Sequence, residues 1–107
     1  MTTFDKREEA FETQFVHDEE IKFKAGARRN KMLGLWVAEK LGLSGDAAAD
    51  YSRAVVTAEI DAASDEAVVR KIMSDLAAKG VAMSEDQLRA RMNELLAAAV
   101  TQIKAGL

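Results

Sequence analysis

The amino-acid sequence predicts an all-α protein, a four-helix bundle with a loosely attached or partly disordered helical segment at its N-terminus. Three observations predict it. Proline is absent, so helices can end only at glycines and capping residues. Apolar residues recur at helical spacing in four stretches. All six aromatic residues lie within the first 51 positions, so the rest of the core must use aliphatic side chains and methionine, which suit closely packed helices.

The first expected helix ends near Leu41, because Gly42 is a natural left-handed stop, while its start is not fixed by the sequence. Ser44 is expected to cap a second helix over residues 45–62, with Asp46 favouring the positive end of the helix dipole. The apolar positions are Ala25, Met32, Leu33, Leu35, Trp36 (as a core anchor), Val37 and Leu41 in the first helix, and Ala48, Tyr51, Val55, Ala58 and Ala62 in the second.

Ser64 is expected to cap a third helix over residues 65–79, and Ser84 with Gln87 has the spacing of a capping box at the start of a fourth, over residues 85–105. The connections are two to five residues long, which makes sequential helices antiparallel neighbours in a bundle. The apolar positions are Val69, Ile72, Met73 and Leu76 in the third helix, and Leu88, Met92, Leu95, Leu96, Ala99 and Ile103 in the fourth.

The first 17 residues have helical propensity but few apolar side chains. Phe4, Phe11 and Phe15 are spaced by seven and four residues, which puts the three rings on one helical face. Burying them gains roughly 5–9 kcal/mol, whereas ordering some 15 residues costs about 1 kcal/mol or more each. Two interpretations stay open: the rings pack back onto the bundle, or the segment becomes helical in the groove of a partner.

Charge is divided between two blocks within a net charge of −3. Residues 1–20 carry seven acids against two bases, and residues 21–40 carry six bases against one acid. Lys24, Arg28 and Lys31 share one helical face, so they are candidate contacts for a phosphate group or a nucleotide. The alternative is a solvated surface, since surface runs of charge are common. The negative net charge argues against a nucleic-acid partner.

The sequence offers little for catalysis. It has one histidine, His17, and no cysteine, and Ser44, Ser64 and Ser84 lie at expected helix caps, so we expect neither an enzyme nor a metal site. The longest uncharged stretch, residues 95–103, is far shorter than the about 20 residues of a membrane span. The acidic N-terminus does not match a signal peptide. We expect a cytoplasmic protein without a cofactor, apart from the candidate nucleotide ligand, and monomeric when free.

Several runs of residues carry a family resemblance. They are Thr3-Phe4-Asp5-Lys6-Arg7-Glu8-Glu9-Ala10-Phe11-Glu12, His17-Asp18-Glu19-Glu20, Phe23-Lys24-Ala25, Ala27-Arg28-Arg29-Asn30-Lys31, Leu33-Gly34-Leu35-Trp36, Ala38-Glu39-Lys40-Leu41-Gly42 and Asp75-Leu76-Ala77-Ala78-Lys79-Gly80-Val81. These runs resemble the alphaproteobacterial ATP synthase zeta subunit, an ATPase inhibitor subunit, over essentially the whole chain. Gly26 is a departure, since a better helix former is expected there, and it suggests a hinge between the N-terminal segment and the bundle.

The resemblance implies a regulatory protein that binds the catalytic head of the F-type ATP synthase and blocks its rotation and ATP hydrolysis. It implies a location peripheral to the inner membrane, through the synthase. The division it suggests is an inhibitory segment over residues 1–20 and a four-helix bundle over residues 21–107. The expected partner-binding residues are Phe4, Phe11 and Phe15 as anchors, with Lys6, Arg7, Glu8 and Glu12 as polar contacts. The alternative function is a small nucleotide-binding helical module that uses the basic face.

Overall fold

The computed structural model describes the backbone of residues 3–107 and the side chains of residues 18–107. Within these residues the chain forms four α-helices and no strand. They are α1 (Thr3–Lys40), α2 (Gly45–Ala62), α3 (Asp65–Ala78) and α4 (Glu85–Lys104). The expected all-α class is confirmed, and each helix ends within one residue of its expected position, which is the usual uncertainty of a helix end.

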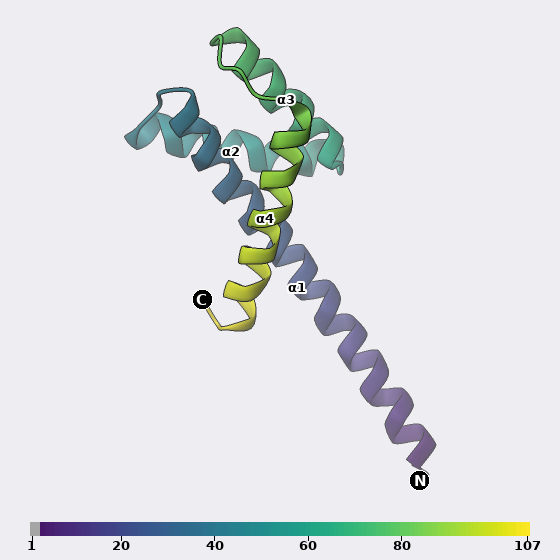
Figure 1. The fold of residues 1–107 in the computed structure, drawn as a ribbon. Helices are drawn as coiled ribbons and strands as arrows, with labels where there is room; N and C mark the ends of the chain where they lie inside the picture. The colour runs from purple at the N-terminus through teal and green to yellow at the C-terminus, as the bar shows by residue number, and fades with distance from the viewer. Residues whose placement is uncertain (1–2) are drawn as a thin grey trace.

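Helix α1 packs against two of the other three helices. It contacts both α2 and α4, and α2 contacts α3, whereas α3 and α4 meet at few positions. Sequential helices were all expected to be close neighbours, but α4 packs mainly against α1. Figure 1 shows the first half of α1 extending beyond the other helices, in a molecule that measures 64 × 25 × 23 Å along its principal axes.

Local signals set most helix ends. The expected capping box starts α4: Ser84 Oγ accepts a hydrogen bond from the Gln87 backbone N–H at 3.0 Å, and Gln87 Oε1 accepts one from the Ser84 N–H at 2.9 Å. Ser64 Oγ accepts from the N–H of Glu66 at 3.1 Å in the first turn of α3. Gly42 has the expected left-handed backbone after α1, with φ of +76°.

The two ends of α2 differ from expectation. Ser44 makes no side-chain capping hydrogen bond. Because Gly45 begins the helix with a left-handed φ of +56°, the first turn does not present its N–H groups to the Ser44 hydroxyl. At the other end, the left-handed residue is Ala63, with φ of 51°. A left-handed backbone costs a residue other than glycine about 1–2 kcal/mol.

The core lies where the second half of α1 meets the other helices. Two of the expected core positions are wrong, because Leu35 is 43% exposed and Ala62 is also exposed. Val68, which the apolar spacing did not single out, is fully buried. The cluster of buried apolar side chains consists of Leu33, Val37, Val55, Val68, Val69, Ile72, Leu76, Leu88, Met92 and Leu95.

Candidate functional site

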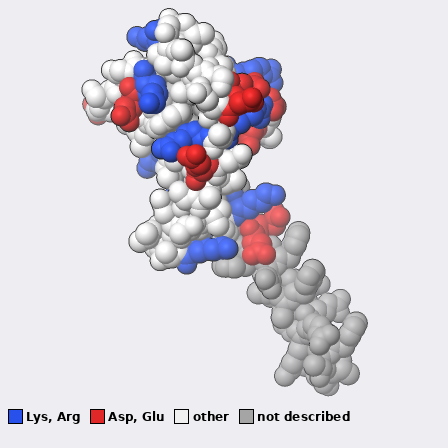
Figure 2. Space-filling model, in the orientation of Figure 1, with Lys and Arg blue, Asp and Glu red and all other residues white. Residues whose placement is uncertain are grey.

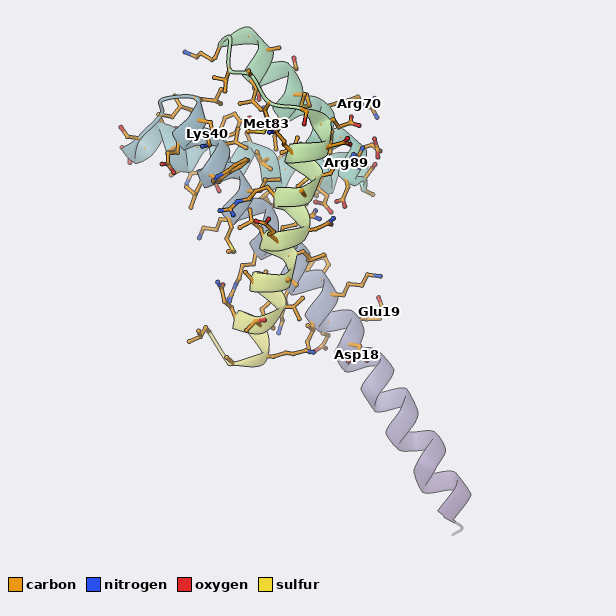
Figure 3. The ribbon with its side chains drawn as sticks, viewed as in Figure 1. Asp18, Glu19, Lys40, Arg70, Met83 and Arg89 are labelled. Atoms are coloured by element: carbon orange, nitrogen blue, oxygen red, sulfur yellow. The ribbon has the colours of Figure 1, made fainter. Side chains whose placement is uncertain are left out.

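The candidate site is α1, a helix of 38 residues of which the bundle covers only the later part. Along the described side chains, Ala25 is the first buried residue of α1. The residues from Asp18 to Lys24 are exposed, except for the half-buried Ile21. Figure 3 places Asp18 and Glu19 close to the level at which the last turn of α4 ends. The stretch of α1 from Asp18 to Lys24 is therefore available to a partner, while the part from Ala25 onward is held by the bundle.

Small residues hold α1 against α2 at close range. A Cβ atom added to Gly34 would lie 2.6 Å from the Cα of Ser52. Ser52 is buried, and its hydroxyl donates a hydrogen bond to the carbonyl oxygen of Lys31 at 2.8 Å. The missing side chain at Gly34 thus lets the two backbones approach, and the serine hydrogen bond fixes the contact.

A buried arginine links α1 to α2 and to the start of α3. Arg29 is only 5% exposed. Its guanidinium donates to Asp65 Oδ1 at 2.6 Å, to Glu59 Oε2 at 3.1 Å, and through Nε to Asn30 Oδ1 at 3.1 Å. The Asn30 amide in turn donates to the Glu59 carboxylate. We call Arg29, Asn30, Glu59 and Asp65 the Arg29 cluster. It lies within about one helical turn of Ala25, close to where α1 leaves the bundle.

The ionic state of the Arg29 cluster follows from its contacts. Burial lowers the pKa of Arg29, but the hydrogen bonds and negative charges of Asp65 and Glu59 more than offset this, so the pKa is raised overall. The hydrogen bond from Arg29 lowers the pKa of Asp65, against an opposing effect of burial. Charged partners on three helices therefore act as one set of charge-assisted hydrogen bonds.

Sequence reasoning missed this cluster, because it treated Arg29 only as one of the six bases of residues 21–40. A signal was available: Ala25, Arg29, Leu33 and Val37 follow each other at intervals of four residues, which puts Arg29 on the buried face of α1. The partners Glu59 and Asp65 could not be identified from local spacing, since they lie 30 and 36 residues away.

The candidate phosphate contacts divide into two kinds. Lys24 and Lys31 are exposed, as expected for residues that could meet a ligand. The Arg28 guanidinium instead donates to the carbonyl oxygen of Leu107 at 2.7 Å and to Gln102 Oε1 at 3.4 Å. Arg28 is thus engaged with the end of α4, so the three side chains do not form a ready-made anion site.

The expected partner-binding residues lie in the first half of α1. Their backbone is helical, but their side chains lie outside the described residues. These are Phe4, Lys6, Arg7, Glu8, Phe11, Glu12 and Phe15. α1 runs through Gly26 without interruption, so the hinge that we expected there is not seen as a break in the helix.

Trp36, expected as a core anchor, is half-buried against the core and leaves part of its ring in a surface groove. Lys40 Nζ and Arg91 Cζ lie 5.5 and 5.3 Å from the ring centroid, in cation–π contacts. Arg91 also donates to Glu94 at 2.9 Å. Lys40 and Arg91 therefore both make contacts within the chain at this groove.

Two further classes of site were sought among the described residues. In that part of the chain, no group of three or more His, Asp or Glu side chains could hold a metal ion. No helix there is long and apolar enough to cross a membrane.

One comparison with known proteins identifies a family. The family model described as ATPase inhibitor subunit zeta matches residues 1–102. The chain is also similar to a protein whose structure was solved by NMR in solution, with 46% sequence identity and a TM-score of 0.70. That likeness covers 81% of this chain and 99% of the other. No curated protein matches the chain.

Proposed function

The chain belongs to the ATPase inhibitor subunit zeta family, and on that premise we propose that it inhibits ATP hydrolysis by placing the N-terminal part of α1 in the catalytic head of the F-type ATP synthase. The observation that carries the proposal is the division of α1. The bundle covers this helix from Ala25 onward, and its first half extends beyond the other helices (Figure 1). A helix presented in this way can enter a cleft without unfolding the bundle.

The cost of ordering the binding segment supports the same mechanism. Three phenyl rings alone do not offset the ordering of a free segment. Starting a helix is the expensive step, and extending an existing helix avoids it. The buried turns from Ala25 to Val37 supply the existing helix. The segment therefore needs less binding free energy from its partner than an unattached peptide would.

We keep the division into an inhibitory segment, residues 1–20, and a bundle, residues 21–107, as a functional proposal. In it, Phe4, Phe11 and Phe15 are the anchors in the head. The polar contacts come from Lys6, Arg7, Glu8 and Glu12. The chain acts as a monomer and is peripheral to the membrane through its partner, without catalysing a reaction itself.

Deleting residues 2–19 tests the proposal directly. Inhibition of ATP hydrolysis by the cognate synthase should be lost, while the thermal unfolding of the bundle should change little, because the described core begins at Ala25. A finer variant replaces Phe4, Phe11 and Phe15 with alanine. Each anchor ring should contribute about tenfold or more to the inhibitory potency. Undiminished inhibition by the deleted protein would refute the proposal.

The alternative of a nucleotide on the basic face remains a prediction. Exposed Lys24 and Lys31 favour it, and the engagement of Arg28 with α4 weakens it. Titration of ATP into the isotope-labelled protein should shift the amide signals around these lysines if the face binds nucleotide. Unchanged spectra at millimolar ATP would remove this alternative.

A further inference from the structure

An exposed apolar surface lies where α1 and α4 meet near the exit of α1 from the bundle. Phe23 is 80% exposed and Leu107 is 77% exposed. Both line one surface hollow, together with Ala27 and Ile103. We call these four residues the α1–α4 patch. Single exposed apolar side chains are common, but a contiguous group from two helices indicates an interaction surface.

The α1–α4 patch is held in place by polar contacts. Arg28 hydrogen-bonds the carbonyl oxygen of Leu107 and the side chain of Gln102, which ties the end of α4 to α1. The Leu107 N–H donates to the carbonyl oxygen of Gln102 at 2.9 Å, which closes the last turn. Leu107 is therefore positioned beside α1. A partner would meet a preformed surface and would spend little free energy on ordering it.

The α1–α4 patch adjoins the proposed inhibitory segment. Phe23 follows Glu19 by four residues, and the rise of an α-helix makes this about 6 Å. Any protein that encloses α1 as far as Glu19 therefore comes within about one helical turn of Phe23. In Figure 2 the lower lobe of the described surface, at the C-terminal end of α4, is largely free of charge.

The chemistry of the rim indicates what the partner presents. Lys24 and Arg28 are the charged residues that line the same hollow as Phe23. Lys104 is exposed at the end of α4 beside Lys24, in a neighbouring hollow that Asp18 and Glu20 also line. An apolar side chain flanked by carboxylates would complement both the patch and these cations.

We propose that the α1–α4 patch is a second contact with the catalytic head, made with the rim of the cleft that α1 enters. Its occupant is an apolar side chain of the head with acidic neighbours. This inference rests on the proposed function and adds to it the surface that stops the inhibitory helix at a fixed depth. Phe23 is then exposed because the partner binds its ring, and folding of the bundle does not depend on that ring.

The test compares full-length Phe23→Ser and Leu107→Ser with Ile60→Ser as a matched control. Ile60 is 73% exposed on α2 and lies outside the patch. In titrations of ATP hydrolysis by the cognate head, Phe23→Ser should weaken inhibition about tenfold, and Ile60→Ser should leave it unchanged. Phe23→Leu should retain most of the potency. Lys24→Glu should weaken inhibition most strongly at low salt.

Three results would overturn the inference. The first is that the Phe23→Ser and Leu107→Ser proteins inhibit as well as the Ile60→Ser protein, while deletion of residues 2–19 abolishes inhibition. The patch would then play no part in inhibition, and the proposed function would still hold. The second is a deletion without effect, which overturns the proposed function itself. The third is a wild-type dimer in sedimentation velocity that Phe23→Ser dissociates without weakening inhibition, because the patch would then join two copies of this chain. Thermal melts should be unaffected by Phe23→Ser, since the side chain is exposed.

Discussion

Two glycines of α1 should respond oppositely to the same substitution. At Gly34 a Cβ atom would lie 2.6 Å from the Cα of Ser52, closer than two such atoms approach. At Gly26 a Cβ atom would meet nothing within 4 Å. Gly34→Ala is therefore expected to destabilise the protein, and Gly26→Ala is expected to stabilise it, although both exchanges raise the helical propensity of α1 equally.

The magnitudes follow from two opposing effects. Alanine in place of glycine within a helix gains up to about 1 kcal/mol. Overpacking a close contact costs about 1–3 kcal/mol, and the cost is high at Gly34 because the obstructing atom belongs to the backbone of Ser52 and cannot rotate away. We expect a net loss of about 1–2 kcal/mol for Gly34→Ala and a gain of up to about 1 kcal/mol for Gly26→Ala.

Urea and thermal unfolding followed by circular dichroism would measure both changes. For a domain of this size, 1 kcal/mol corresponds to about 4–8 °C in the midpoint of thermal unfolding. The close α1–α2 contact is refuted as a stability determinant if Gly34→Ala melts at or above the wild-type temperature. In the inhibition assay Gly26→Ala should raise potency up to about fivefold, because a stiffer helix loses less entropy when its N-terminal part is bound.

Three further predictions concern protonation and capping. The pKa of Asp65 is lowered by the hydrogen bond from Arg29, so its carboxylate adds stability above about pH 3.9 that is lost as the pH falls toward the folded-state pKa. The free energy of unfolding, measured in urea, should fall less between about pH 5 and pH 3 in Asp65→Asn than in the wild type. Because Asp65 is half-exposed, the difference should be no more than about 1 kcal/mol, and an unchanged pH profile would contradict this. Ser84→Ala should cost about 1 kcal/mol in the same unfolding assay, and Ser44→Ala much less, since of these two serines Ser84 alone makes a capping hydrogen bond; equal losses would argue against the observed caps. Burial, and then its hydrogen bond to the Asp75 carboxylate of α3, raises the pKa of Tyr51, the only tyrosine in the sequence. Ultraviolet titration should therefore show little phenolate at about pH 10 in the folded protein and the usual half-ionisation after unfolding. The free energy of unfolding that this shift contributes is present below about pH 10 and is lost as the pH rises further.

The helices and most of their ends could be predicted because their causes are local. The Ser84–Gln87 capping box and the glycine after α1 are each complete within a few residues of sequence. Ser44 failed as a cap because the following glycine took a left-handed backbone. The end of α2 at Ala63 could not be predicted, because alanine rarely adopts the left-handed backbone that Ala63 has there.

The packing could be predicted only in part, because apolar spacing gives one face of a helix but not the helix that covers it. Leu35 was assigned to the core and is exposed, while Val68 was passed over and is fully buried. Both errors concern which helices pack together: α4 packs mainly against α1 and meets α3 at few positions. The buried side of α1 and of α3 depends on which helices cover them, and the residues near Leu35 and Val68 do not indicate which helices these are.

Candidate contact residues were even less accessible to sequence reasoning. The aromatic spacing of the first 17 residues and the family resemblance indicated a binding segment, whose side chains lie outside the described residues. Phe23 was not singled out, because it does not share the spacing of Phe4, Phe11 and Phe15. Its importance depends on Leu107, which is brought beside it only in the folded chain.

The proposed inhibitory segment and the buried part of α1 form one continuous helix, which gives the bundle a mechanical connection to the segment. A separate segment on a flexible linker could reach a cleft, but movement of the bundle would not be transmitted to it. In a continuous helix, the contacts at Arg29 and Gly34 set the direction of every preceding turn. The Arg29 cluster joins three helices near the exit of α1, so a change in the packing of α2 or α3 would alter that direction at the point of greatest leverage. Control of the proposed inhibition through the bundle would therefore require no contact between the bundle and the segment, only an intact helix between them.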